Sequence, residues 1–245
     1  MKPTVLLMGF EPFGGDETNP SWDIASQLDG WPVRLDGSEE GPPIAVVQSV
    51  RLPCVFHEAL NALDHALARH RPVAVIGLGL AASRHDISVE RIAINVDDAR
   101  IPDNAGRQPI DTPVCPGAPA AYWSTLPIKA IVAALQEAGI AASVSQSAGT
   151  FVCNHVFFGL AHRLAGRRRR AGPVAARRTQ AARPASASAR GGFIHVPWPA
   201  SQAQSPGANG GAMDLETMTE AIRIAIRTTL TAGEADLRLP GGALD

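Results

Sequence analysis

A cysteine at the start of a predicted helix is the first residue of this chain that could do covalent chemistry. Cys153 lies in SQSAGTFVCNHVFFGLAHRL, residues 145–164, where a small-residue turn follows a strand pattern. Apolar residues from position 156 to position 164 keep the i, i+3, i+4 spacing of one buried helical face. The free N–H groups at a helix start favour a thiolate, the nucleophile of cysteine chemistry. The other interpretation is a small apolar side chain that caps a core helix.

A histidine in a predicted strand is the best partner for this thiol. His195 lies between Ile194 and Val196 in GGFIHVPWPA, and a single strand histidine is more often structural than catalytic. His155 is two residues from Cys153, so its side chain should point away around the helix. His162 is more than two turns further on, and the remaining histidines lie elsewhere, at positions 57, 65, 70 and 85.

An acid and two aromatic residues complete the candidate set. Glu90 lies in a loosely alternating stretch, residues 87–96, where it is either a solvated residue, a salt-bridge partner or the group that orients a histidine. Phe10 and Phe13 lie in the glycine-rich loop GFEPFGGDETNPSW, which lacks the spacing of a phosphate-binding loop. These two rings either hold an apolar ring of a ligand or pack under the loop as local core.

The elements that position these residues alternate between strand and helix. The patterns predict strands at residues 4–8, 44–52, 71–78 and 142–147, and helices at 21–28, 55–68, 127–138 and 214–230, with a Pro- and Gly-rich connection at 111–127. Pro20 near a first helical position and Asp214 as an N-cap mark two helix starts. This order predicts an α/β fold, a three-layer α/β/α sandwich around a twisted, mostly parallel (mixed) sheet.

The composition narrows the function classes. The chain has 245 residues, a net charge of -1 and three cysteines. Because the cysteine count is low and odd, we expect a reducing compartment and no disulfide framework. No apolar run is long enough for a membrane span, and the N-terminus does not read as a signal peptide. We expect a single domain over residues 1–245, a cytoplasmic location, no membrane association, and no cofactor or metal.

One segment departs from the alternating pattern. Residues 166–192 contain eight arginines, no acid and almost no large apolar residue, which predicts a disordered Arg/Ala-rich surface insertion. Arginine clusters attract phosphate and acidic surfaces, but this tract has no aromatic residue for base stacking. A nucleic-acid partner is therefore not the expectation.

Four stretches, in order, resemble the pyroglutamyl-peptidase I (pyrrolidone-carboxylate peptidase) family of cysteine peptidases. They are the N-terminal GFEPFGGDETNPSW, the segment 79–104 with ISVERIAINVDDARIPDN, the nucleophile segment SAGTFVCNHVFFGLAH, and GGFIHVP. The resemblance covers nearly the whole chain apart from the arginine tract, which lengthens the link between Cys153 and His195.

The resemblance implies a function and a role for each residue. Cys153 would be the nucleophile, His195 the general base and then acid, and Glu90 the group that orients His195, in a thioester mechanism that removes an N-terminal pyroglutamyl residue from peptides. Arg100 would lie near this site. The ring pocket would comprise Phe10, Phe13, Ile101, Phe151 and Val152, and the family implies a homotetramer or dimer.

Two other functions remain open at this point. A catalytically degenerate member could bind nucleic acid or another polyanion through the arginine tract, with steep salt dependence. Another cysteine amidase could keep Glu90, Cys153 and His195 and change the pocket, although the two phenylalanines argue against it.

Overall fold

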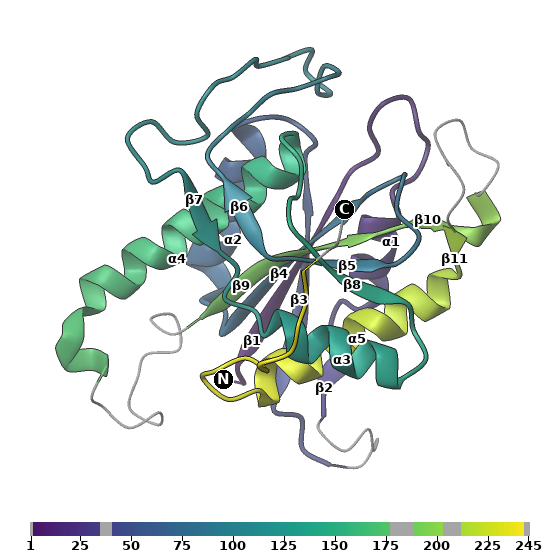
Figure 1. Cartoon of the computed structure of the whole chain (residues 1–245), viewed down its shortest axis with the longest axis vertical. Helices are drawn as coiled ribbons and strands as arrows, with labels where there is room; N and C mark the ends of the chain where they lie inside the picture. The colour runs from purple at the N-terminus through teal and green to yellow at the C-terminus, as the bar shows by residue number, and fades with distance from the viewer. Residues whose placement is uncertain (1, 35–40, 177–188, 203–211, 243–245) are drawn as a thin grey trace.

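A twisted, mixed sheet of seven strands forms the centre of the molecule (Figure 1). The computed structural model describes residues 2–34, 41–176, 189–202 and 212–242. The strand order is β2-β3-β1-β4-β9-β5-β8, with β2–β3 and β5–β9 antiparallel and the other pairs parallel. The strands are β1 (Thr4–Phe10), β2 (Pro32–Val33), β3 (Ala45–Leu52), β4 (Ala74–Leu80), β5 (Ile87–Glu90), β8 (Ala142–Ser145) and β9 (Arg190–Val196).

Helices cover both faces of this sheet. They are α1 (Pro20–Gln27), α2 (Glu58–His70), α3 (Ile128–Glu137), α4 (Val152–Ala176) and α5 (Leu215–Thr231). Helices α1, α3 and α5 pack on one face and share one apolar core with it, whereas α2 and α4 share a second core with the other face (Figure 1). The predicted three-layer α/β/α sandwich is confirmed.

Alternation along β1 explains why the sheet has two cores. Val5 and Leu7 point into the α1, α3, α5 core, and Leu6 and Met8 point into the α2, α4 core. All four side chains are fully buried. A strand between two helical layers must be apolar on both faces, which is why it reads as a continuous apolar run.

Two helix starts follow the signals in the sequence. Asn19 caps α1, since its side chain accepts from the backbone N–H of Ser21, and Pro20 takes the first helical position. Asp214 caps α5 by accepting from the backbone N–H groups of Glu216 and Thr217.

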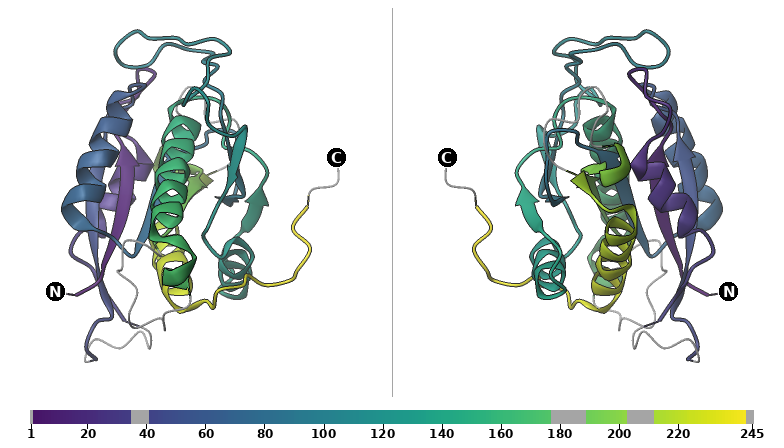
Figure 2. Two further views of the ribbon diagram at one scale, coloured as in Figure 1. Left: turned by 90° about the vertical axis from the view of Figure 1, so that its left-hand side faces the viewer. Right: turned by 90° about the vertical axis from the view of Figure 1, so that its right-hand side faces the viewer.

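A long connection lies beyond the carboxyl ends of the central strands. Residues 95–120 follow β6 (Ile92–Ile94) and lead to β7 (Ala121–Trp123), which pairs antiparallel with β6. Figure 2 shows this connection at the top of both views. The sequence predicts residues 111–127 as an irregular link, and β7 within it is the difference, because backbone pairing with β6 is not visible in composition. In a second small sheet, β10 (Trp198–Pro199) pairs with β11 (Ala212–Met213). The 3-10 helix η3 (Ala200–Gln202) follows β10.

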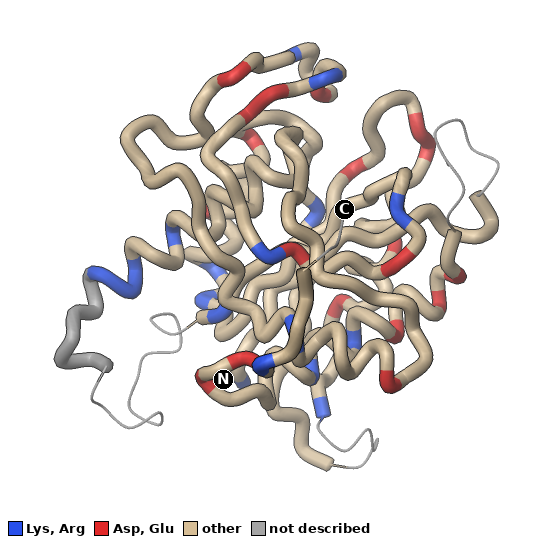
Figure 3. The backbone as a smooth tube through the Cα atoms, viewed as in Figure 1, with Lys and Arg blue, Asp and Glu red and all other residues tan. Residues whose placement is uncertain are grey.

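The arginine tract differs in part from the expected loop. Residues 166–176 continue helix α4, and residues 190–192 belong to strand β9, so the loop prediction is wrong at both ends. Arginine and alanine are good helix formers, so a helix anchored in the core continues through them. Figure 3 shows basic residues on the outer half of α4. Arg190 donates to the carbonyls of Thr229 and Ala232 and is part of the folded body. Residues 177–188 lie outside the described part of the chain.

The described cysteines are all free. Cys54 is buried, whereas Cys115 and Cys153 are partly buried. Burial is the main reason that the pKa of Cys54 lies far above its ordinary value. Within the described residues, no helix combines the length and the apolar character that a membrane crossing requires.

Candidate active site

Glu90 and His195 form a buried hydrogen-bonded pair near the carboxyl ends of their strands. His195 Nδ1 lies 2.8 Å from Glu90 Oε1, and Glu90 is fully buried. Strands β5 and β9 run antiparallel, with Ser88 opposite His195 and Val89 opposite Ile194. Glu90 is therefore one residue past the last residue of β5 that pairs with β9. Arg84 Nη1 donates to the same carboxylate oxygen at 2.7 Å. Glu90 therefore holds the imidazole of His195 through Nδ1, and Arg84 in turn holds the carboxylate of Glu90.

The charge of Glu90 is maintained by these partners. Burial pushes its pKa upward, but the hydrogen bond and charge of His195, with the charge of Arg84, outweigh burial and bring the pKa below its ordinary value. Glu90 is thus a carboxylate at neutral pH. A carboxylate at Nδ1 fixes the imidazole tautomer and stabilises the imidazolium.

Cys153 lies on the same side of the sheet as His195. It is the second residue of α4, and its sulfur lies so close to Gly79 of β4 that a Cβ there would be 2.8 Å from Sγ. Gly79 is the register partner of His195, and side chains at paired positions point to one face. The ring of Phe193, two residues before His195 on that face, has its centroid 5.0 Å from that of His195, and a Cβ at Gly79 would lie 2.8 Å from this ring. The hydrogen bonds of the described residues do not include one between Cys153 and His195.

The thiol is not a preformed thiolate in this structure. Burial, followed by the negative charge of Glu90, raises the pKa of Cys153 to about 12. The charge of Arg84 and the backbone N–H at the helix start act in the opposite direction but do not outweigh these effects. The helix start therefore acts in the expected direction, but desolvation is the larger effect on the pKa of Cys153 in the free protein. A base must take the proton when the sulfur attacks.

Aromatic rings pack around the start of α4. Phe13 and Phe151 have centroids 6.0 Å apart, and Phe56 meets Phe151 edge-on at 5.4 Å. Phe10 is 6.2 Å from Phe193 and only 2% exposed, so of its two interpretations the core one holds in this structure. Val152 is fully buried in the same core.

The other two expected pocket residues lie on the long connection. Arg100 and Ile101 are exposed, with Ile101 at 38%. Asp98, just before them, is tied to the residue that precedes Phe151: its N–H donates to the Thr150 carbonyl at 3.0 Å, and its carbonyl accepts from Thr150 Oγ1 at 2.7 Å. The connection therefore reaches the start of the nucleophile helix.

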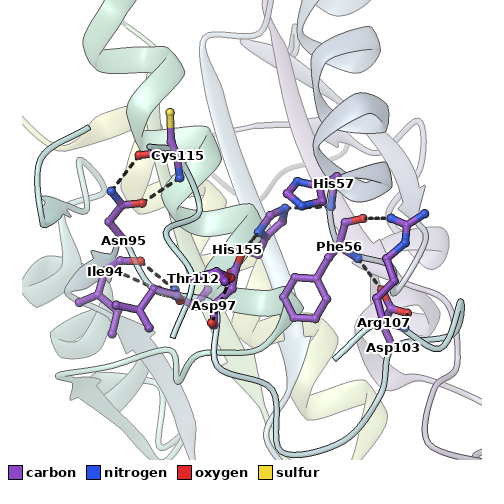
Figure 4. Close-up of polar contacts among 12 residues, drawn as sticks. Phe56, His57, Ile94, Asn95, Asp97, Asp103, Arg107, Thr112, Cys115 and His155 are labelled. Carbon is purple, nitrogen blue, oxygen red and sulfur yellow. Dashed lines mark hydrogen bonds and ion pairs between the residues drawn. The ribbon is translucent and has the colours of Figure 1, made fainter. Parts of the chain in front are cut away.

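Three polar residues at this site were not singled out from the sequence. Arg84 is unremarkable in AASRHD, yet it contacts Glu90 and the Ser147 carbonyl at 2.9 Å. His155 binds Asp97, with Nδ1 2.7 Å from Oδ2 (Figure 4). A motif of alternating acids and apolar residues, NVDDARIPDN, was the available signal for Asp97.

Comparison with known proteins identifies the family of this chain. The family model described as pyroglutamyl peptidase matches residues 3–175. The chain is 50% identical to a pyrrolidone-carboxylate peptidase of Klebsiella pneumoniae and 49% identical to one of Cupriavidus taiwanensis, over 98% and 99% of both chains. The crystal structure of pyroglutamyl peptidase I from Bacillus amyloliquefaciens superposes with a TM-score of 0.81 at 39% identity, over 98% of this chain and 100% of that one. The chain therefore belongs to the pyroglutamyl peptidase family of cysteine peptidases.

Proposed function

We propose that this enzyme removes an N-terminal pyroglutamyl residue from peptides through a thioester on Cys153. The observation that carries this proposal is the Glu90–His195 pair, 2.8 Å long and buried, on the face of the sheet where Cys153 lies against Gly79. The names of the relatives agree with the substrate class.

The chemistry follows from the proton positions. His195 takes the thiol proton as Sγ of Cys153 bonds to the carbonyl carbon, which leaves a tetrahedral oxyanion. Backbone N–H groups at the start of α4, including that of Cys153, stabilise this oxyanion. His195 gives the proton to the leaving amine as the C–N bond breaks. Water, deprotonated by His195, then attacks the thioester and releases pyroglutamate and the thiol.

The substrate ring explains the aromatic surroundings. A pyroglutamyl ring is a small neutral lactam with one donor and one acceptor, and it suits apolar walls with few polar groups. Phe13, Phe151 and Ile101 are the expected residues that it contacts, with Phe10 and Val152 behind them and Arg100 near the reacting carbonyl. A free N-terminal glutamine carries an ammonium group, whose desolvation costs free energy here.

A fluorogenic pyroglutamyl amide tests this function. Wild type should hydrolyse it under reducing conditions, iodoacetamide should abolish turnover, and Cys153→Ser should be inactive. The matching glutaminyl amide should be a poor substrate. No turnover by reduced wild type, or equal rates on the two amides, would contradict the proposal.

We also propose that the enzyme is a cytoplasmic dimer or tetramer. Free Cys54, Cys115 and Cys153 agree with a reducing compartment. Light scattering on the reduced full chain measures the mass, and a monomer at micromolar concentration would contradict the assembly.

A further inference from the structure

A second histidine–carboxylate pair lies beside the active site and takes no part in the chemistry described above. His155 and Asp97 are 0% and 2% exposed, and His155 Nδ1 lies 2.7 Å from Asp97 Oδ2. The other ring nitrogen, Nε2, accepts the backbone N–H of His57 at 3.0 Å (Figure 4). Because a backbone N–H can only donate, Nε2 carries a lone pair, and the proton is on Nδ1. The imidazole is neutral, with one tautomer fixed from both sides.

The contact to His57 holds a strained turn. His57 has φ 66° and ψ -40°, and the N–H of Glu58 donates to the Phe56 carbonyl at 2.8 Å, which together make a γ-turn with positive φ. Such a conformation persists only where surrounding contacts determine it. His155 is one of those contacts, from the helix that carries Cys153.

The other contacts come from the long connection. Phe56 N–H donates to Asp103 Oδ2 at 2.9 Å, and Arg107 Nη1 donates to the Phe56 carbonyl at 2.6 Å. Arg107 Nη2 also pairs with Glu58 at 2.7 Å. The turn is thus held by residues 103–107 on one side and by His155 on the other.

Asp97 fixes the base of the same connection. Its backbone pairs with Thr112, with N–H to carbonyl distances of 2.7 and 3.0 Å. Arg100 and Ile101 follow within four residues, between Asp97 and Asp103. One buried pair therefore sets the position of this segment against the start of α4.

We propose that Asp97 and His155 are positioning residues that hold residues 97–112 and the turn at His57 where the acyl group of the substrate binds. The proposal rests on the proposed function. Loss of the Asp97–His155 pair should therefore raise KM for the pyroglutamyl substrate. The reactivity of Cys153 should depend on Glu90 and His195 instead.

Two amide variants separate the two contacts of His155. His155→Asn keeps a donor near the position of Nδ1 and loses the acceptor for the N–H of His57. Asp97→Asn keeps an acceptor for Nδ1–H and loses only the charge. Asp64→Asn is the matched control, since exposed Asp64 pairs with Arg163 and also joins α2 to α4, away from the turn.

The experiment measures kcat, KM, the rate of Cys153 carboxamidomethylation and amide hydrogen exchange of peptides that contain residues 56–58. His155→Asn should raise KM about tenfold, since small misplacements of substrate contacts cost up to about 10²-fold, with kcat and alkylation within about threefold of wild type. Exchange at the turn should accelerate. Asp97→Asn should raise KM less than about threefold, and Asp64→Asn should change nothing.

Three outcomes would overturn the proposal. They are an unchanged KM in folded His155→Asn, a parallel fall of kcat and alkylation rate, and a melting temperature that falls with no change of KM. If His155→Asn does not fold, Arg107→Ala tests the same turn from the other side, and an unchanged KM there counts against the proposal. Active wild type with unchanged variants defeats this inference alone, whereas inactive wild type defeats the proposed function.

Discussion

The molecule contains two buried histidine–carboxylate pairs with nearly the same geometry, His195–Glu90 at 2.8 Å and His155–Asp97 at 2.7 Å. They differ in what the second ring nitrogen faces. Nε2 of His155 accepts a backbone N–H, whereas the described residues provide no hydrogen-bond partner for Nε2 of His195. A histidine whose two ring nitrogens are both hydrogen-bonded within the protein has no free lone pair to accept a proton from a reacting group. The environment of Nε2, and not the acid, separates the proposed catalytic pair from the proposed positioning pair.

The largest effect should come from removing the charge of one acid at a time. Glu90→Gln should lower kcat/KM about 10³–10⁴-fold, because a neutral amide no longer fixes the tautomer of His195 or stabilises its imidazolium. Asp97→Asn makes the same change in the other pair and should leave kcat within about threefold. Steady-state rates on the pyroglutamyl amide decide this, and similar losses in both variants would remove the distinction between the pairs.

A smaller effect should follow from filling the space beside the thiol. Gly79→Ala places a Cβ 2.8 Å from Cys153 Sγ and from the Phe193 ring, so the sulfur must move. We expect the turnover rate to fall about 10²-fold, in line with the cost of a misplacement of about 1 Å. Gly166→Ala on the outer part of α4 is the control, since nothing lies within 4 Å of its Cβ. Wild-type turnover in Gly79→Ala would show that the sulfur does not depend on this contact.

The pH dependence of alkylation tests the proton on the thiol. With a pKa of about 12, Cys153 is a thiol at neutral pH, and its thiolate fraction grows about tenfold per pH unit below that value. The iodoacetamide rate of wild type should therefore rise without a plateau from pH 7 to pH 9. A plateau near neutral pH would instead indicate a thiolate–imidazolium pair with His195.

The smallest effect concerns stability in acid. The pKa of Glu90 is lower in the folded than in the unfolded chain, so its contribution is present above the unfolded value, about 4.3, and is lost as pH falls through the folded value. Glu90→Gln should lack this part of the decline. Urea midpoints between pH 3 and pH 6 measure it, and parallel curves for wild type and variant would count against a lowered pKa.

Much of the fold was predictable because buried strands and amphipathic helices leave periodic patterns. Strand β4 reads as a continuous apolar run, and the cap at Asp214 is a local signal. Short β7 was not predictable, since its pairing with β6 involves the backbone. The extent of α4 was not predictable from apolar content, because residues 166–176 continue the helix through the helix propensity of arginine and alanine.

The candidate site was predictable for residue types with few alternative uses. Cys153 and His195 stood out, and the structure joins His195 to Glu90 at 2.8 Å. The roles of Arg84 and Asp97 were not predictable, because an arginine or aspartate in a loop has many possible partners. Only folding selects a partner 58 residues away, as it does for Asp97 and His155.

The turn at His57 also has a consequence for folding kinetics. Its stabilising contacts join residues 47 and 98 positions apart in the chain, Phe56 to Asp103 and His57 to His155. The local hydrogen bond from the Glu58 N–H to the Phe56 carbonyl does not offset the strain of a positive φ. We therefore expect the turn to form only after these distant segments have met, and loop closure over such separations is slow. Activity should therefore return later than helical circular dichroism during refolding. The segment around His57 then becomes native only after α4 and the long connection have packed against it.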